Sequence, residues 1–282
     1  MFDRLLKPLP MGAIVAEWVL GMTLYTTIVA WLLYRFEIEL VDMAAEMTLL
    51  NGLILGLLLV FRNNTAYDRW WEGRKLWGQL VNDSRNLSLK AMSVASPEER
   101  RQLARLLGGF ANALRLHLRG PTKLADVPGF GQEAAKPIHV PLYLAGQVQA
   151  LADEWRVSGR IEAALTPVFD VHIRGLMDVC GACERIHTTP LAKSYVALLR
   201  HGIAIYAVAA PWFVAWDIGF WSIPVSALMF YYIFGVELLA EELEDPFGTG
   251  PDDLDLDRYC RTIENSVNQV LLTDQPATAI RA

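Results

Sequence analysis

The chain has 282 residues, of which 53% are hydrophobic and 20% charged, and its formal net charge is −6. This is more apolar than an ordinary soluble domain, and the negative charge, without a basic patch, argues against a nucleic-acid partner. Three cysteines in a chain of this length give no disulfide framework and favour a reducing compartment. Because the apolar residues gather at both ends around a polar middle, we expect a membrane part and a cytoplasmic part.

Two apolar stretches open the chain. Residues 11–33 are long enough to cross a bilayer, and residues 47–61 form a second apolar segment. The second segment passes into a polar one with no proline before Pro97, so we expect a single long helix over about 41–94. That helix would lie in hydrocarbon at one end and in water at the other.

Basic residues mark the inner side of the membrane. Arg4 and Lys7 precede the first span. Four further basic residues follow the second span: Arg62, Arg69, Arg74 and Lys75. The turn between the two spans, residues 35–42, is mostly acidic. The positive-inside rule therefore places the N-terminus and the polar middle in the cytoplasm.

The polar middle is predicted to be helical. Ser96 followed by Pro97 and two glutamates is typical of a helix N-terminus, and Gly120-Pro121 ends that helix. A proline-rich loop extends to Pro141. Further helices are expected over about 142–157 and 161–186, and no strand pattern is found, so the fold class is all-α.

The second half of the chain returns to the membrane. Residues 195–215 and 222–239 form a third and a fourth span, and residues 256–272 could form an amphipathic surface helix. Four spans place both termini on the cytoplasmic side of a bacterial inner membrane. The expected divisions are 1–61 with spans one and two, 62–194 as the cytoplasmic region, 195–240 with spans three and four, and 241–282 as a cytoplasmic segment.

One face of the second span could line a pore. Leu53, Leu57 and Phe61 are spaced by four residues and share a face, and the side chains become polar directly after Phe61. Gly52 and Gly56 form a small-residue pair that would let copies of the helix approach closely. Packing against another span explains the same spacing. Four spans cannot enclose a pathway alone, so a pore would need several subunits.

Three segments resemble one family. Residues 61–78, Phe-Arg-Asn-Asn-Thr-Ala-Tyr-Asp-Arg-Trp-Trp-Glu-Gly-Arg-Lys-Leu-Trp-Gly, resemble the signature after the second membrane helix of bacterial bestrophin homologues. Residues 183–191, Cys-Glu-Arg-Ile-His-Thr-Thr-Pro-Leu, look like their second signature, and residues 245–248 are similar to their post-membrane motif. The resemblance implies an all-α homopentameric ion channel with one axial pore, four spans per subunit and a large helical cytoplasmic region.

By position, the resemblance implies which residues narrow the pore. The hydrophobic neck falls on Leu53, Leu57 and Phe61, and the cytoplasmic constriction falls on Leu191. The family usually has a proline after the constriction residue, where this chain has Ala192-Lys193. Animal members hold calcium in an acidic segment after the third motif. Gly250 and Pro251 interrupt that segment here, so we assign no metal and no cofactor.

Other residue patterns predict little chemistry. Cys180 and Cys183 form a CxxC with His187 nearby, but the motif lies mid-helix without enough ligands for a metal, so a structural role is expected. The charges between residues 68 and 75 are interpreted as subunit contacts or a solvated face. No nucleophile–base pair or phosphate-binding glycine loop occurs, so we do not expect an enzyme.

The sequence thus predicts a homopentameric channel that passes small monovalent ions through a hydrophobic neck and a cytoplasmic constriction. Its partners would be further copies of itself, membrane lipid and the ions. The residues that could modulate selectivity are Asp42, Glu46 and Lys193, and cations are favoured over chloride because the outer acids outnumber the single lysine. A membrane-anchored scaffold or regulatory protein that conducts nothing is the alternative, and a secondary transporter ranks third.

Overall fold

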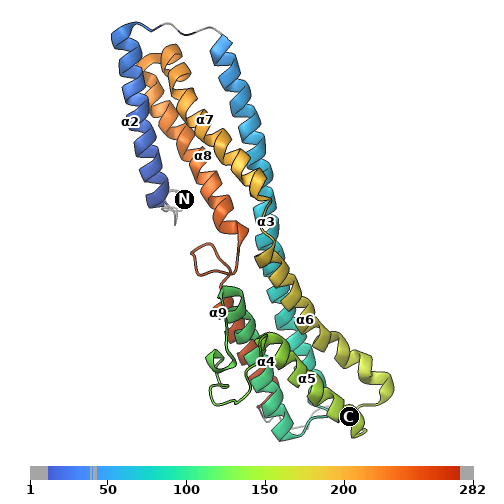
Figure 1. Ribbon diagram of the computed structural model, residues 1–282. Coiled ribbons are helices and arrows are strands. Elements are labelled where there is room, and N and C mark those ends of the chain that lie inside the picture. The colour runs from blue at the N-terminus through green and yellow to red at the C-terminus, as the bar shows by residue number, and fades with distance from the viewer. Residues whose placement is uncertain (1–11, 39, 41–42, 274–282) are drawn as a thin grey trace, which may run out of the picture. The chain divides into compact units, whose positions relative to one another are not determined.

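The computed structural model describes residues 12–38, 40 and 43–273, and within them the regular structure is entirely helical (Figure 1). The contacts divide the chain into two compact units. Unit 1 comprises residues up to Trp70, then Pro190–Pro246 and Gly250–Asp252. Unit 2 comprises Trp71–Thr189, Phe247–Thr249 and the residues from Asp253 onward.

The long helix predicted from the missing prolines is confirmed. Helix α3 runs without a break from Met43 to Ala91, 49 residues, and the boundary between the units falls inside it, between Trp70 and Trp71. The abrupt change from apolar to polar side chains after Phe61 does not interrupt the helix, because helical hydrogen bonds are satisfied within the backbone whatever the surroundings.

Unit 1 also contains α2 (Gly12–Phe36), α7 (Lys193–Ile218) and α8 (Ser222–Glu244). These three helices lie side by side (Figure 1). A short 3-10 turn, η3 (Gly219–Trp221), joins α7 to α8. Three stretches among the described residues are long and apolar enough to cross a membrane: Gly12–Phe36, Thr48–Ala91 and Lys193–Glu244.

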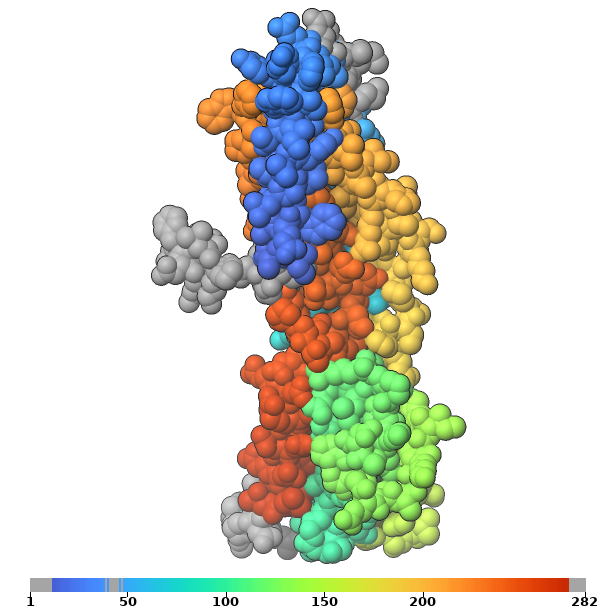
Figure 2. All heavy atoms as spheres, turned by 60° about the vertical axis from the view of Figure 1, so that its left-hand side comes forward, coloured from blue at the N-terminus to red at the C-terminus, as the bar shows by residue number. Residues whose placement is uncertain are grey.

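Unit 2 contains four further α-helices: α4 (Pro97–Arg119), α5 (Val140–Val157), α6 (Thr166–Thr188) and α9 (Leu256–Leu271). The expected start of α4 is confirmed, because Ser96 and Glu99 form a complete capping box. Helices α4 and α9 pack against each other and lie side by side at the surface (Figure 2). Two short 3-10 turns, η1 (Leu124–Asp126) and η2 (Ala163–Leu165), lie in the connecting loops.

Several helix starts differ by a few residues from the sequence-based expectation, among them those of α3 at Met43 and α5 at Val140. Helix α6 begins at Thr166 rather than at 161, because Pro167 lacks a backbone N–H and fits only in the first turn. Helix α7 begins at Lys193 rather than at 195, with Ala192 as its N-cap. The amphipathic tail helix is confirmed as α9, but its apolar face is buried against α4.

Candidate functional site

The exposed face of α3 is apolar. Leu53, Leu57 and Phe61 are 72%, 55% and 55% exposed in the single chain. At about 100° of rotation per residue, the exposed positions between Leu49 and Phe61 form an arc centred on Leu57. The three residues that the family resemblance assigns to the neck therefore share one face that no helix of their own chain covers.

The opposite face of α3 packs inside unit 1. Leu55 and Leu59 form a buried cluster with Leu199 and Ile203 of α7. Gly52 also faces α7, because a Cβ at that position would lie 3.0 Å from the hydroxyl of Tyr206. Gly52 thus makes room for a helix of the same chain, whereas a Cβ at Gly56 would meet open space, and close approach between copies stays a prediction.

An ion-pair network begins directly after Phe61. The Arg62 side chain is 1% exposed, and its Nε lies 3.0 Å from Oε2 of Glu237 on α8. The other oxygen of Glu237 lies 3.1 Å from Nε of Arg200, whose Nη2 lies 2.9 Å from Oε1 of Glu241. A charge as buried as that of Arg62 is stable only when paired, so its ion pair with Glu237, extended to Arg200, holds α3, α7 and α8 in one arrangement.

Glu244 connects this network to the predicted constriction. Its Oε2 lies 3.8 Å from Nη2 of Arg62, and its Oε1 accepts a hydrogen bond of 2.9 Å from the backbone N–H of Leu191. Its backbone carbonyl accepts a bond of 2.8 Å from Nε of Arg69. One residue at the end of α8 therefore holds the turn that contains Leu191.

The candidate selectivity residues are placed in different ways. Glu46 lies in the first turn of α3 and is exposed, and Asp42 lies outside the described residues. Lys193 is exposed and is the first residue of α7. Because α7 begins at Lys193, the alternation of side chains along an extended segment does not relate the direction of Lys193 to that of Leu191.

Several charges of the first signature bind within the chain. Glu72 pairs with Arg185 of the second signature, with 2.5 Å between Oε1 and Nη2. Arg69 and Glu72 therefore have partners within the chain, and the interpretation of the charges between residues 68 and 75 as subunit contacts or a solvated face is corrected for these two residues only. In the post-membrane segment, Asp255 caps α9 and Asp257 pairs with Arg115. These two acids therefore support helices.

A second polar cluster lies in unit 2. Nε2 of His117 and Nε2 of His139 each lie 2.7 Å from Oε1 of Glu184. Burial of the Glu184 carboxyl opposes its ionisation, but the hydrogen bonds from His139 and His117 outweigh burial and hold its pKa below the ordinary value. Cys180 Sγ lies 3.6 Å from the same oxygen. Burial raises the pKa of Cys183 to about 12, so its thiol is not reactive.

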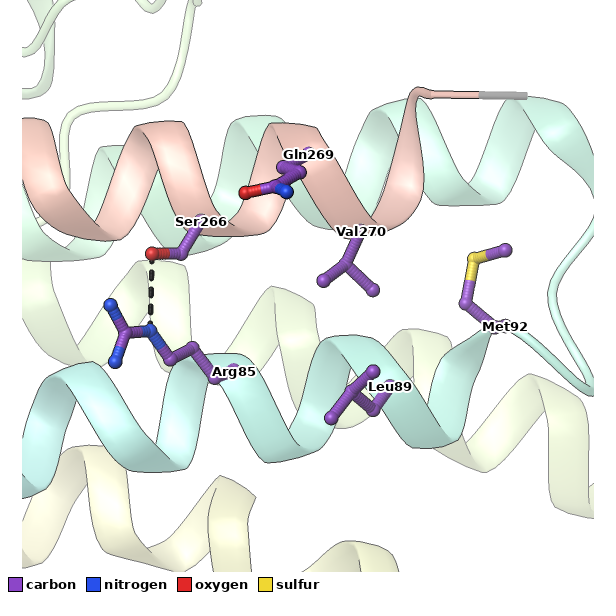
Figure 3. A pocket seen from close by; sticks show the side chains of 6 residues that line it. All are labelled: Arg85, Leu89, Met92, Ser266, Gln269 and Val270. Atoms are coloured by element: carbon purple, nitrogen blue, oxygen red, sulfur yellow. Dashed lines mark hydrogen bonds between the residues drawn. The ribbon is translucent and has the colours of Figure 1, made fainter. Parts of the chain in front are cut away.

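Two hollows in the surface show what else the described residues form. In unit 2, a hollow of about 380 Å³ lies between the end of α3 and α9, where Arg85 Nε donates to Ser266 Oγ at 3.1 Å (Figure 3). Leu89 and Val270 line it with apolar side chains. In unit 1, a hollow of about 320 Å³ lies beside α7 and α8, between Trp18 and Arg200. Both are open to the surface, and neither brings together a cluster of reactive groups.

Sequence reasoning missed both polar clusters. Arg62 was interpreted only as a positive charge at the inner membrane edge, and its acidic partners Glu237 and Glu244 were not assigned a role. The two partners of Arg62 lie far along the chain: Glu237 is 175 residues away and Glu244 is 182 residues away. The one available signal was that Arg62 directly follows an apolar helix.

Comparisons with known proteins agree on one family. Residues 11–269 match the family described as Bacterial/Fungal Bestrophin protein. A protein of Nostoc named as voltage-dependent anion channel-forming is 33% identical over 254 residues, covering 85% of this chain and 81% of its own. A protein of Mesorhizobium japonicum with the same type of name is 34% identical over 259 residues, covering 90% and 84%. A crystal structure of a bacterial bestrophin homologue from Klebsiella pneumoniae superposes with a TM-score of 0.83 at 25% identity, covering 92% and 99%.

Proposed function

The chain belongs to the bacterial and fungal bestrophin family, and from this premise we propose that it is the subunit of a homopentameric ion channel. The observation that carries the proposal is the face of α3 that contains Leu53, Leu57 and Phe61. This face stays exposed in the single chain while the opposite face packs against α7. Copies of the face arranged around an axis would form a hydrophobic neck.

The proposed topology has four crossings per subunit. The candidate span Lys193–Glu244 contains two helices, α7 and α8, joined by the turn η3. With 26 and 23 residues, each exceeds the roughly 20 residues that a crossing needs. Together with α2 and the first part of α3 they would make four crossings, and with the positive-inside rule we propose that both termini and the polar middle lie on the cytoplasmic side of a bacterial inner membrane.

The proposed constriction is formed by Leu191. The carboxylate of Glu244 binds the Leu191 N–H and also faces Arg62, the residue that directly follows Phe61. A movement of α3 at Phe61 would therefore be transmitted to the Leu191 turn through a single side chain. This contact supports a channel in which the neck and the constriction change together.

Two observations favour opposite charges for the permeant ion. The relatives from Nostoc and Mesorhizobium japonicum carry names of anion channels. The acids of the outer turn favour cations, but of these Asp42 lies outside the described residues and Glu46 is exposed without a defined direction toward an axis. We give the relatives more weight and propose that small monovalent anions pass, with the cation preference expected from sequence as the alternative.

Reconstitution of the purified protein into liposomes tests the channel. An ion flux that depends on the protein is expected, and reversal potentials in asymmetric sodium chloride report the sign of the permeant ion. A shift toward the chloride equilibrium potential supports anions, and a shift toward that of sodium returns the proposal to cations. No flux under any salt or voltage would favour the scaffold instead.

The neck assignment has a matched control on another helix. Replacing Leu53, Leu57 and Phe61 together with alanine should raise open probability with little change in ion preference, because apolar side chains only oppose wetting of the pore. Leu20, Leu24 and Ile28 of α2 have the same spacing and are also exposed, at 69%, 64% and 49%. Their triple alanine variant should leave the flux unchanged. Equal effects of the two variants would refute the neck.

A further inference from the structure

Three potential metal ligands converge in unit 2 from distant parts of the sequence. His117 lies in the last turn of α4, His139 is the N-cap of α5, and Glu184 lies on α6. One ligand atom from each lies within 4.8 Å of the other two. None of α4, α5 and α6 is a candidate membrane span. The cluster is therefore separate from the helix faces that carry the proposed channel function.

The burial of the cluster suits a ligand that enters from solvent. The side chains of His117, His139 and Glu184 are 30%, 30% and 32% exposed. They are held in place by three packed helices and remain reachable from the surface. Two imidazoles and a carboxylate form a donor set that zinc sites use when a further position stays open to water.

We propose that His117, His139 and Glu184 form a binding site for a divalent transition-metal ion of the zinc class. Two imidazole nitrogens disfavour calcium and magnesium, which prefer oxygen ligands. The mixed nitrogen and oxygen set suits zinc, cobalt or nickel ions. Sequence analysis did not identify these three residues, because Glu184 lies 45 and 67 residues from the two histidines along the chain and no short metal-binding spacing connects them.

Binding requires a small rearrangement of hydrogen bonds. Nδ1 of His139 accepts a bond of 3.0 Å from the Leu142 N–H, so its Nε2 carries the proton that faces Glu184. A metal ion at Nε2 replaces that proton and moves it to Nδ1, which ends the capping bond to Leu142. The distances of 2.7 Å from each imidazole to Glu184 would open to about 3.4 Å, the separation of ligands around tetrahedral zinc.

A metal ion bound at the site would stabilise the folded state of unit 2. A metal ion bound by residues 117, 139 and 184 links α4, α5 and α6 at one point. An ion that binds only the folded state raises its stability in proportion to the logarithm of the ion concentration above the dissociation constant. Zinc should therefore raise the melting temperature, whether or not the protein conducts ions.

The test uses tag-free, full-length protein in detergent after treatment with a chelator. Titration with cobalt ions should give visible absorption bands that saturate at one ion per chain and disappear when zinc is added. His117→Ala, His139→Ala and Glu184→Gln should each weaken binding by more than about tenfold, the loss found even for outer-shell partners of metal sites. His201→Ala, an exposed histidine on α7, is the matched control and should bind as the wild type does.

Melting curves distinguish a variant that has lost metal binding from one that does not fold. Glu184→Gln keeps the shape of the side chain and a hydrogen-bond acceptor, so it should melt cooperatively without metal yet gain no stability from zinc. Wild type and His201→Ala should gain stability from the same zinc concentration. The proposal is overturned if cobalt does not bind saturably, or if binding survives in all three variants, which would leave a hydrogen-bonded cluster only.

Discussion

The two units of the chain follow opposite rules of burial. In unit 1, α2, α7 and α8 expose large apolar side chains such as Leu24 and Tyr232, whereas Thr26 and Ser226 are fully buried. In unit 2, helices α4 and α9 bury their apolar faces and leave charged residues outside. The surface of unit 2 is thus polar, as expected in water. The exposed surface of unit 1 is apolar, as expected for contact with lipid or, under the proposed function, with further copies of the chain.

This difference determines which side chains hold each unit together. Lipid is as apolar as a leucine side chain, so burying leucine in unit 1 gains little, and small residues and paired polar groups give the helices their specific arrangement. In unit 2, removal of apolar surface from water is the main source of stability. The same type of substitution should therefore have different effects in the two units.

The largest contrast is expected between two phenylalanines. Phe110 on α4 is fully buried and Phe61 on α3 is 55% exposed. Phe110→Ala should lower the free energy of unfolding by about 3–5 kcal/mol, because it removes apolar contacts and leaves a cavity. Phe61→Ala should change the melting temperature of detergent-solubilised protein little and instead change ion flux. Equal losses of stability in the two variants would show that Phe61 is packed inside the subunit.

The next effect should come from a buried charge in unit 1. Glu237→Ala leaves Arg62, 1% exposed, with Glu244 at 3.8 Å as its nearest acid among the described residues. Removing the nearer partner of a buried ion pair costs about 3 kcal/mol, which thermal unfolding would detect, because the contact at 3.8 Å replaces only part of the lost interaction. Glu241→Ala is the control, because Glu241 is 53% exposed and pairs with Arg200. A combined Arg62→Met and Glu237→Leu variant should recover most of the loss; no recovery would argue against the ion pair as the cause.

A smaller effect is expected at Glu244. Glu244→Ala removes the acceptor of the Leu191 N–H and should cost about 2 kcal/mol, typical of a hydrogen bond to a charged group. It should also alter open probability, because the Leu191 turn loses its anchor. Glu244→Gln keeps an acceptor and should have less than half the effect on both measurements. If Glu244→Gln behaves like the alanine variant, the contact with Arg62 matters more than the one with Leu191.

The smallest effect concerns pH and unit 2. The side-chain hydrogen bond from Arg160 lowers the pKa of Glu99 from 4.5 to about 2, so its ionised form is favoured in the folded state. The contribution is fully present above pH 4.5 and is lost as the pH falls toward 2. Glu99→Gln keeps the acceptor of the capping box but removes the charge that binds Arg160, so it should lower stability by about 1 kcal/mol at neutral pH, with a difference from wild type that shrinks in acid.

The neighbouring residue supplies the control for this pH dependence. Glu98 lies beside Glu99 in the first turn of α4, and its side chain is 82% exposed. Glu98→Gln should show almost no pH-dependent difference from wild type, because exposed pairs contribute little. Melting temperatures across the acid range would measure both variants. A difference at Glu99 that grows as the pH falls would contradict the assigned direction.

The sequence alone determined the helices and their surroundings. Apolar length predicted the membrane stretches, the absence of proline predicted the continuous α3, and Ser96 with Glu99 predicted the start of α4. These features are local, because a helix satisfies its own hydrogen bonds and its caps lie within a few residues. The spacing of Leu53, Leu57 and Phe61 also placed them on one face without knowledge of the fold.

Only the tertiary structure decided which polar residues meet. Arg62 with Glu237, Glu244 with Leu191, and Glu184 with two histidines each join positions at least 45 residues apart. Helix periodicity shows which residues share a face but not which face another helix covers. That choice depends on packing between helices, and it turned Gly52 toward Tyr206 and brought His117 and His139 to one carboxylate.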